Sequence, residues 1–250
     1  MEYSHPLGNL KITFVKFLGK LMGYVSIIIL RLFFRIDKNS SELIISSAFH
    51  APWKEDSKFK EFNNLIKGTT LLDNKRLYTL YYLSKTQRKI SGDILDIGCL
   101  KGGAGFVMSY ANQKGKVHLV DSFVGLIENE KYHKKDHFIF KNIDFVKNKI
   151  KDLKLKNTFV HRGIFPRTFK NRILSKKIKL CHIDVNTFQS TKKTFEHVER
   201  KLVKNGIIVF DDYGIFSVNG VKKFVDQLIK SNKKFIFINN YMGQCILIKK

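Results

Sequence analysis

The stretch GDILDIGCLKGGAG, residues 92–105, joins a short apolar run to a glycine-rich turn. The run from Asp93 to Gly98 has the length of a buried β-strand, and glycines that interrupt regular structure bound it on both sides. A buried strand that passes through glycines into a helix is typical of a parallel α/β sheet whose ligand lies at the turn. We therefore expect residues 92–105 to open such a sheet.

Six further apolar runs follow the first. Stretches long enough for crossover helices separate the first five runs, and in residues 188–205 the side chains of Phe188, Phe195 and Leu202 share one helical face. Only the four residues NYMG separate the last two runs, which predicts a hairpin with an antiparallel last strand. The chain is therefore predicted to be an α/β protein with a doubly wound, seven-stranded, Rossmann-like sheet and an N-terminal helical extension. The expected strands are residues 93–98, 116–121, 157–163, 178–185, 206–212, 234–239 and 244–249.

The first turn indicates which cofactor the sheet holds. A dinucleotide fold needs G-x-G-x-x-G, because its pyrophosphate approaches bare backbone amides. Here Asp96 stands near the end of the strand, where it would repel a pyrophosphate. Gly98, Gly102 and Gly103 still leave room for a close ligand. S-adenosylmethionine (SAM) has no phosphate and carries an amino group and a sulfonium, so we predict SAM, with Asp121 placed to accept both ribose hydroxyls.

Carboxylates end the fourth and fifth runs. Asp184 ends the fourth, and Asp211 and Asp212 end the fifth. Neighbouring strands lie about 4.8 Å apart, so these side chains can converge on one ion at the carboxyl edge of the sheet. Three oxygen donors without cysteine suit a hard cation such as Mg²⁺, which we predict at this place. Helix caps or ion pairs with nearby lysines are the alternative interpretation of each acid.

Length and composition limit the other choices. The chain has 250 residues, 44% of them hydrophobic, which suits one globular domain with a helical extension. Its 46 Lys and Arg against 21 Asp and Glu give a net charge of +25. This charge favours phosphate-rich partners or an anionic membrane, although a lysine-rich genome accounts for it equally well. The cysteines, Cys99, Cys181 and Cys245, are too few and too far apart for a disulfide framework or a zinc site, and they fit a reducing cytoplasm.

Residues 11–40, KITFVKFLGKLMGYVSIIILRLFFRIDKNS, look like a membrane span, but the uncharged run 21–30 has only ten residues. On a helical wheel the basic residues share one arc and the apolar residues lie opposite. Residues 1–40 are therefore predicted to form a basic amphipathic helix in a membrane interface, or one that packs on its own domain or a partner. The basic residues are Lys16, Lys20, Arg31 and Arg35, and the apolar residues are Phe14, Leu18, Leu21, Val25, Ile29 and Leu32.

Residues 41–90 are predicted to form a helical cap that shapes the acceptor pocket, before the main domain at residues 91–250. Asp73 is placed to cap a helix. After it, four residues recur at helical spacing: Leu77, Leu80, Tyr81 and Ser84.

Five blocks carry a family resemblance: GDILDIGCLKGGAGFVMSYA, VHLVDSFVGL, VHRGIFPRTF, HIDVNTFQSTKKTFEHVERKLVKNGIIVFDDYG and GVKKFVDQL. In order and spacing they resemble the macrocin O-methyltransferase family of the TylF and MycF type, over about residues 70–230. The resemblance implies a class I methyltransferase domain, SAM, Mg²⁺ and methyl transfer to a sugar hydroxyl. It implies cofactor contacts along the turn from Asp96 to Gly103 and at Asp121, Ser122 and Gly163, and metal ligands at Asp184, Asp211 and Asp212.

Two positions depart from the family pattern. Many relatives have an acid two residues after the first metal aspartate, where this chain has Asn186, and some have a histidine after the DDY triplet, where it has Gly214. The first change predicts weaker or altered metal coordination, and the second leaves the general base open. The catalytic candidates are Asp184, Asp212 and His182, because a hydroxyl beside a cation needs only a modest base. His182 is equally interpreted as a buried strand residue.

The sequence as a whole predicts a SAM-dependent, Mg²⁺-assisted O-methyltransferase that acts on a sugar or glycan hydroxyl. The expected acceptor is a small molecule or a lipid- or nucleotide-linked sugar, and a homo-oligomer is left open. The expected location is the cytoplasm, peripheral on the inner face of the membrane. Two alternatives are an RNA methyltransferase that uses the basic surface and a catalytically silent, membrane-associated protein of the same fold. No NPPY-type motif supports the RNA alternative.

Overall fold

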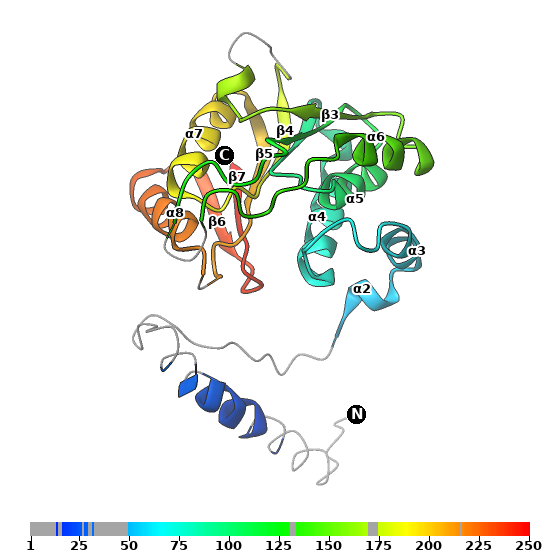
Figure 1. Cartoon of the computed structure of the whole chain (residues 1–250). Coiled ribbons are helices and arrows are strands. Elements are labelled where there is room, and N and C mark those ends of the chain that lie inside the picture. Colours follow the sequence, from blue (N-terminus) through cyan, green and yellow to red (C-terminus); the bar gives the residue numbers. More distant parts are fainter. Residues whose placement is uncertain are drawn as a thin grey trace. The chain divides into compact units, whose positions relative to one another are not determined.

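The computed structural model describes residues 14, 17–26, 28–29, 32, 50–130, 134–169, 175–215 and 217–250. The chain forms two compact units, Met1–Pro52 and Trp53–Lys250 (Figure 1). The second unit contains the complete sheet and every residue of the predicted SAM and metal sites.

The described residues of the first unit between 14 and 32 are helical. Their large apolar side chains are exposed, and Leu21, for example, is 48% exposed. Among the helices that the structure describes, none is both long enough and apolar enough to cross a bilayer. Three residues of the predicted basic side lie outside the described residues: Lys16, Arg31 and Arg35.

The second unit is built on seven strands: β1 (Asp93–Ile97), β2 (Val117–Asp121), β3 (Thr158–Arg162), β4 (Ile178–Ile183), β5 (Leu202–Phe210), β6 (Phe235–Asn239) and β7 (Cys245–Lys249). Their order in the sheet is β3-β2-β1-β4-β5-β7-β6. Neighbours from β3 to β5 pair in parallel, and β7 pairs antiparallel with β5 and β6. The predicted fold class and antiparallel last strand are therefore confirmed.

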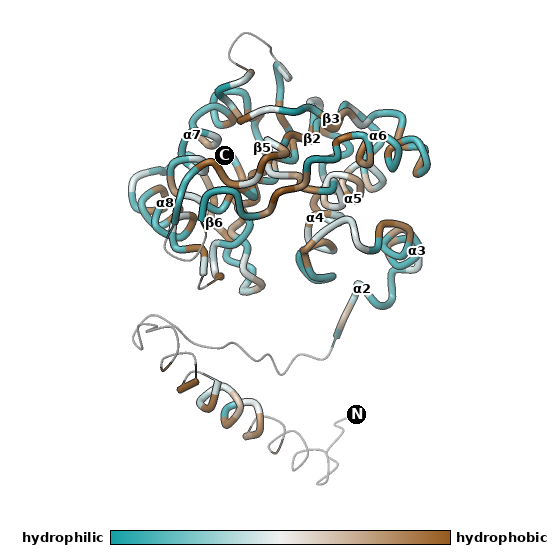
Figure 2. The backbone as a smooth tube through the Cα atoms, viewed as in Figure 1, coloured by the Kyte–Doolittle hydropathy of each residue, from teal (hydrophilic) through white to brown (hydrophobic). Residues whose placement is uncertain are grey.

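The helices of this unit are α2 (Pro52–Glu55), α3 (Ser57–Leu65), α4 (Asn74–Thr86), α5 (Gly103–Ala111), α6 (Ile143–Asp152), α7 (Phe188–Glu199) and α8 (Asn219–Ser231), with 3₁₀ turns η1 (Gln87–Lys89) and η2 (Arg167–Phe169). Successive strand residues face opposite sides of the sheet. On β1, Ile94 joins a core with side chains of α3, α4, α5 and α6, whereas Leu95 joins a core with side chains of α7 and α8. Figure 2 shows the hydrophobic residues concentrated along the strands between these helices.

Helix α4 begins as predicted. Asp73 caps it, and its side chain accepts hydrogen bonds from the backbone N–H groups of Lys75 and Arg76. The four residues expected at helical spacing are all buried. This cap fixes the first turn of α4, from which Arg76 reaches the carboxyl ends of β4 and β5.

The boundary between α7 and β5 differs from the sequence prediction. The helical pattern was extended to residue 205, but α7 ends at Glu199 and β5 begins at Leu202. Leu202 pairs with Ile178 of β4 and is 3% exposed. A leucine at this spacing fits a helix and a strand equally, so tertiary pairing decides between them.

Candidate functional site

A cavity of about 300 Å³ opens at the carboxyl ends of β1, β4 and β5. The crossover direction changes between β1 and β4, and α/β sheets bind ligands at such switch points. The segment before the sheet contributes Thr70, Leu71, Leu72 and Arg76 to its wall. Eight of the predicted site residues also line it: Gly98, Asp121, Ser122, Gly163, His182, Asp184, Asp211 and Asp212.

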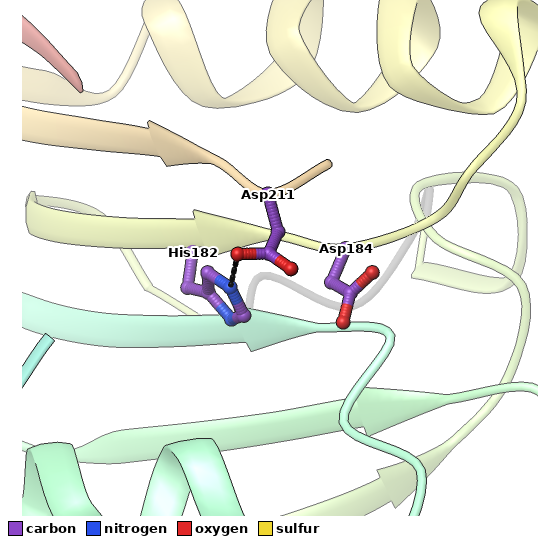
Figure 3. Close-up of side chains that lie close together, drawn as sticks. All are labelled: His182, Asp184 and Asp211. Carbon is purple, nitrogen blue, oxygen red and sulfur yellow. Dashed lines mark ion pairs between the residues drawn. The ribbon is translucent and has the colours of Figure 1, made fainter. Parts of the chain in front are cut away.

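His182, Asp184 and Asp211 lie together in this wall (Figure 3). One ligand atom from each lies within 4.8 Å of the other two. Asp184 directly follows β4 and Asp211 directly follows β5, and the parallel pairing of these strands puts both carboxylates at one edge. The structure thus brings together two of the three predicted metal ligands, with a histidine that was predicted only as a catalytic candidate.

His182 lies between two carboxylates. Its Nδ1 is 2.8 Å from Asp96 Oδ1, and its Nε2 is 3.8 Å from Asp211 Oδ1. Burial lowers the pKa of the ring, but the two carboxylates outweigh burial and raise the pKa to about 10. A ring that is protonated at neutral pH has no lone pair to accept a proton, so His182 is a poor general base in this state.

Arg76 of α4 holds the two adjacent acids after β5. Its Nη1 donates to Asp211 Oδ2 at 2.5 Å and to Asp212 Oδ1 at 3.0 Å, while its Nε donates to Asp73 Oδ2 at 3.1 Å. Its side chain is only 14% exposed. Burial lowers the pKa of the guanidinium, but these carboxylates raise it above its ordinary value, so Arg76 is a fixed positive charge in the cavity wall.

Asn186 links the remaining acids. Its amide nitrogen lies 2.9 Å from Asp212 Oδ2 and 3.1 Å from Asp184 Oδ1, and it donates to both in the orientation that its neighbours require. Asn186 therefore presents its NH₂ group to the carboxylates, and its oxygen does not join the acidic cluster. This geometry fits the sequence departure at this position, because an acid there would add a further negative charge.

The three aspartates titrate differently. Burial, and then the charges of Asp211 and Asp212, raise the pKa of Asp184 well above its ordinary value. Burial also acts to raise the pKa of Asp211, but the nearby His182 ring and the Arg76 guanidinium outweigh burial and lower the pKa. Burial and the Asp211 charge raise the pKa of Asp212 to about 6 against the opposing effect of Arg76. Asp212 is thus mostly ionised at neutral pH and still able to take up a proton.

The donor set fits a hard divalent cation. Asp184 and Asp211 offer carboxylate oxygens, and His182 Nε2, buried without a hydrogen-bond partner, can join them only once the ring has lost its extra proton. Burial, and then repulsion from Asp211 and Asp212, raises the pKa of Asp184, which indicates that the centre can accept more positive charge. Oxygen-rich sites with few other donors suit Mg²⁺. Asp212, the third predicted ligand, is engaged by Arg76 and Asn186 instead.

The predicted SAM side of the cavity is formed by the turn after β1 and by the end of β2. Gly98 has a left-handed φ of 91°, and a Cβ there would lie 1.8 Å from the Asp184 carbonyl oxygen. The carboxylate of Asp121 accepts hydrogen bonds from the N–H groups of Leu100 and Phe123 at 2.8 and 2.7 Å. Each of its oxygens can accept a second hydrogen bond, and the carboxylate lines the cavity.

Three predicted cofactor residues do not line the cavity. Asp96 is fully buried behind His182, whose Nδ1 it contacts. Gly102, with a left-handed φ of 92°, is the N-cap of α5, and the N–H of Gly103 donates to the Thr69 carbonyl. These residues position the turn and the histidine.

Sequence reasoning missed two residues of the site. Arg76 bonds the acids from 135 positions away, and Gln244 donates its side-chain N–H to Asp211 Oδ1 at 2.8 Å. Gln244 is fully buried and directly precedes β7. A lone arginine among 46 basic residues carries no local signal, and only the sheet pairing brings Gln244 to β5.

Solved structures with this fold include O-methyltransferases. The O-methyltransferase NovP is 18% identical, with a TM-score of 0.62 over 73% of this chain and 82% of that chain. CalS11, a calicheamicin methyltransferase, is 13% identical, with a TM-score of 0.58 over 85% of this chain and 99% of that chain. An O-methyltransferase from Bacillus cereus in complex with SAH is 16% identical, with a TM-score of 0.55 over 78% and 91% of the two chains. At these identities the likeness establishes the fold.

Sequence comparison establishes the family. No curated protein sequence matches the chain. The family model described as Macrocin-O-methyltransferase (TylF) matches residues 30–241, which is most of the 250 residues. The match extends further toward the N-terminus than the blocks that suggested it. The resemblance predicted from the sequence is therefore confirmed, and the chain belongs to the macrocin O-methyltransferase (TylF) family.

Proposed function

We propose that this O-methyltransferase transfers the methyl group of SAM to a hydroxyl of a sugar or glycan, with a divalent cation at the acidic cluster. The observation that carries the proposal is that Asp121 and the Asp184–Asp211 cluster line the same cavity. SAM supplies a methyl group on a positively charged sulfur, which leaves as a neutral thioether. Membership of the macrocin O-methyltransferase family supports the proposal, and the fold shared with the O-methyltransferase NovP supports methyl transfer to oxygen.

The chain's own residues provide binding and charge. The carboxylate of Asp121 lies at the predicted ribose position and accepts hydrogen bonds from the backbone there. Gly98 has no side chain, so the space between the ends of β1 and β4 stays open. Asp184 and Asp211 would hold the cation, which would favour the ionised form of an acceptor hydroxyl. With SAM bound, these residues would hold an acceptor oxygen where it could take the methyl group, the sulfur keeping the carbon–sulfur electrons as it leaves.

The acceptor proton needs a base. Asp212 is our choice, because its pKa of about 6 leaves it mostly ionised at neutral pH and able to take a proton. His182 is protonated under the same conditions and serves to hold Asp211. Positioning and charge stabilisation then account for most of the rate acceleration.

The first test is a calorimetric titration of SAM into wild type and Asp121→Asn, with Mg²⁺ and with EDTA. An amide at this position gives up one of two backbone hydrogen bonds and the negative charge, so we expect SAM affinity to fall by about tenfold or more. The matched control is Asp152→Asn, an exposed aspartate on α6. No binding by the wild type, or equal binding by Asp121→Asn, would remove the proposed cofactor site.

The acceptor is tested separately. The enzyme is incubated with SAM and simple glycosides, nucleotide-linked sugars, a catechol and an RNA oligonucleotide, and methylated products are detected by mass spectrometry. We expect methylation of sugars with adjacent hydroxyls and loss of turnover in Asp184→Asn with SAM binding retained. Methylation of the RNA oligonucleotide alone would favour the alternative that the protein is an RNA methyltransferase. SAM binding without turnover on any acceptor would favour a catalytically silent protein.

We also propose that the first unit binds an anionic membrane surface as a peripheral anchor, which would place the enzyme near lipid-linked acceptors. Ten large apolar side chains among the described residues 14–32 are 38–76% exposed. Burial of such a face in the lipid interface is favourable, and the basic charge of the chain adds attraction to anionic headgroups.

Flotation with vesicles tests the anchor in the full chain. Leu21→Glu with Val25→Glu puts two charges on the apolar face, and we expect this variant to lose flotation with anionic vesicles that the wild type retains. Equal flotation of both proteins would contradict the anchor and leave packing on the domain or a partner as the alternative. A homo-oligomer stays a prediction.

A further inference from the structure

The acidic cluster already contains a cation of the protein's own. The Arg76 guanidinium contacts one oxygen of Asp211 and one of Asp212, the two adjacent acids of the predicted metal set. The side chain of Asp211 is 1% exposed and that of Asp212 is 16% exposed, so water screens these ion pairs weakly. A divalent cation that uses all three aspartates therefore has to compete with Arg76.

Every oxygen of these two acids has a protein donor. Asp211 Oδ1 accepts from Gln244 and Oδ2 from Arg76, while Asp212 Oδ1 accepts from Arg76 and Oδ2 from Asn186. A metal ion that binds to these oxygens is repelled by the Arg76 guanidinium, the one charged donor among them, unless that donor moves away. Gln244, directly before β7, is fully buried and Asn186 is 8% exposed, so neither side chain moves without disturbing packed structure.

Arg76 is the donor that can leave. Its side chain is long, comes from α4 instead of the sheet and lines the open cavity. A second partner is already in place, because Arg76 Nε donates to Asp73 Oδ2 at 3.1 Å and that carboxylate is 54% exposed. When the guanidinium releases Asp211 and Asp212, it can therefore keep its ion pair with Asp73.

We propose that Arg76 is the resident counter-cation of Asp211 and Asp212, and that a divalent cation enters the cluster in exchange for its guanidinium. Because of this exchange, the metal binds more weakly than it would to three carboxylates without a resident cation. When the metal binds, the Arg76 side chain leaves Asp211 and Asp212 and is available to Asp73 and to the acceptor cavity. The inference concerns the regulation of the proposed methyltransferase site and rests on that proposed function.

The test is the affinity for Mn²⁺, measured by the loss of the free-ion EPR signal, for wild type and Arg76→Gln. Glutamine removes the competing charge and leaves a polar side chain, so we expect Mn²⁺ to bind at least about tenfold more tightly. The matched control is Lys75→Gln, the exposed neighbour on the same helix turn, for which we expect a change below about twofold. An equal gain in both variants would mean general charge repulsion and would overturn the exchange.

A second variant, Arg76→Lys, distinguishes an effect on metal affinity from a loss of folding. Arg76→Lys keeps one positive charge but cannot bridge two carboxylates and Asp73 at once, so its Mn²⁺ affinity should lie between wild type and Arg76→Gln. SAM titration in EDTA for all four proteins reports the cofactor site independently. Unchanged or weaker Mn²⁺ binding in Arg76→Gln with SAM binding intact would overturn the inference alone, whereas loss of SAM binding by the wild type would count against the proposed function.

Discussion

At the scale of single residues, Gly98 shows how closely two strand ends approach in this site. A Cβ at Gly98 would lie 1.8 Å from the Asp184 carbonyl oxygen, and the backbone there is left-handed with φ of 91°. We expect Gly98→Ala to lower the free energy of unfolding by at least about 3 kcal/mol, measured by urea denaturation.

Gly68 is the control for that substitution. It also has a left-handed φ, of 80°, but a Cβ there would meet nothing within 4 Å. Gly68→Ala should therefore cost only the backbone strain, about 1 kcal/mol. Equal losses in the two variants would show that the contact with Asp184 is relieved by a small shift of the strand ends.

His182 gives a prediction for pH. Its pKa is about 10 in the folded protein and 6.5 in the unfolded chain, so the folded state holds the extra proton between these values. The resulting stabilisation is complete below pH 6.5 and is lost as the pH rises through 10. In EDTA, the unfolding free energy of wild type should fall relative to His182→Gln by up to about 1.4 kcal/mol per pH unit between pH 7 and 9. If the unfolding free energies of wild type and His182→Gln changed equally with pH, the result would contradict the raised pKa of His182.

At the scale of elements, the buried face of α7 stabilises the sheet that carries the acids. Phe195 is 3% exposed and packs against Phe210 of β5 and Phe224 of α8. Phe195→Ala should lower the unfolding free energy by about 3–5 kcal/mol in urea denaturation, because it leaves a cavity in the core.

The matched control is Phe145 on α6, which is 37% exposed. Phe145→Ala removes the same atoms from a position that is still in contact with water, and we expect a loss of about 1 kcal/mol. Similar losses at the two positions would mean that the α7 layer can collapse into the space left by the ring.

The elements also show which local patterns predict structure. The cap at Asp73 and the buried face of α4 follow from spacing that the sequence displays directly. The end of α7 does not, because Leu202 satisfies both periodicities and its pairing with Ile178 decides for β5. The role of Arg76 is equally hidden, since it depends on where the first turn of α4 lies beside the end of β5.

At the scale of the whole molecule, one cluster of basic residues lies at the opposite edge of the sheet from the acids. A cleft at the amino ends of β1, β2 and β4 is lined by seven basic residues, and Asp93 is the only acid among its described lining residues. The basic residues are Arg88, Lys89, Lys114, Lys116, Lys176, Lys177 and Lys179. Strands of five residues separate this edge from the acidic cluster by about 16 Å, so a nucleic acid held there is poorly placed for methyl transfer.

Polyanion binding tests this distribution of charge. We expect Lys114→Glu with Lys177→Glu to elute from heparin at clearly lower salt than wild type, because both residues line the cleft. The control, Lys193→Glu with Lys204→Glu, changes the net charge equally at exposed positions outside it. SAM affinity should stay the same in both variants. Equal elution of the two variants would assign heparin binding to the net charge of +25 alone.

The sequence by itself determined the class of this protein. Runs of apolar residues, their separation and the acids that end them are local properties, because strand length, helical spacing and turn residues act within a few positions of the chain. They were sufficient for the seven-stranded sheet and its antiparallel last strand, and they marked Asp184 and Asp211 as residues that meet, whereas the family came from the resemblance of five sequence blocks.

Only the tertiary structure decided how those acids are neutralised. Arg76 reaches Asp211 across 135 positions, Gln244 reaches it through β-sheet pairing, and Asp96 lies behind His182 instead of facing the cavity. Such contacts depend on the path of the whole chain and on which charges become buried together. A buried carboxylate takes whichever donor the fold brings within reach, and no spacing along the sequence records that choice.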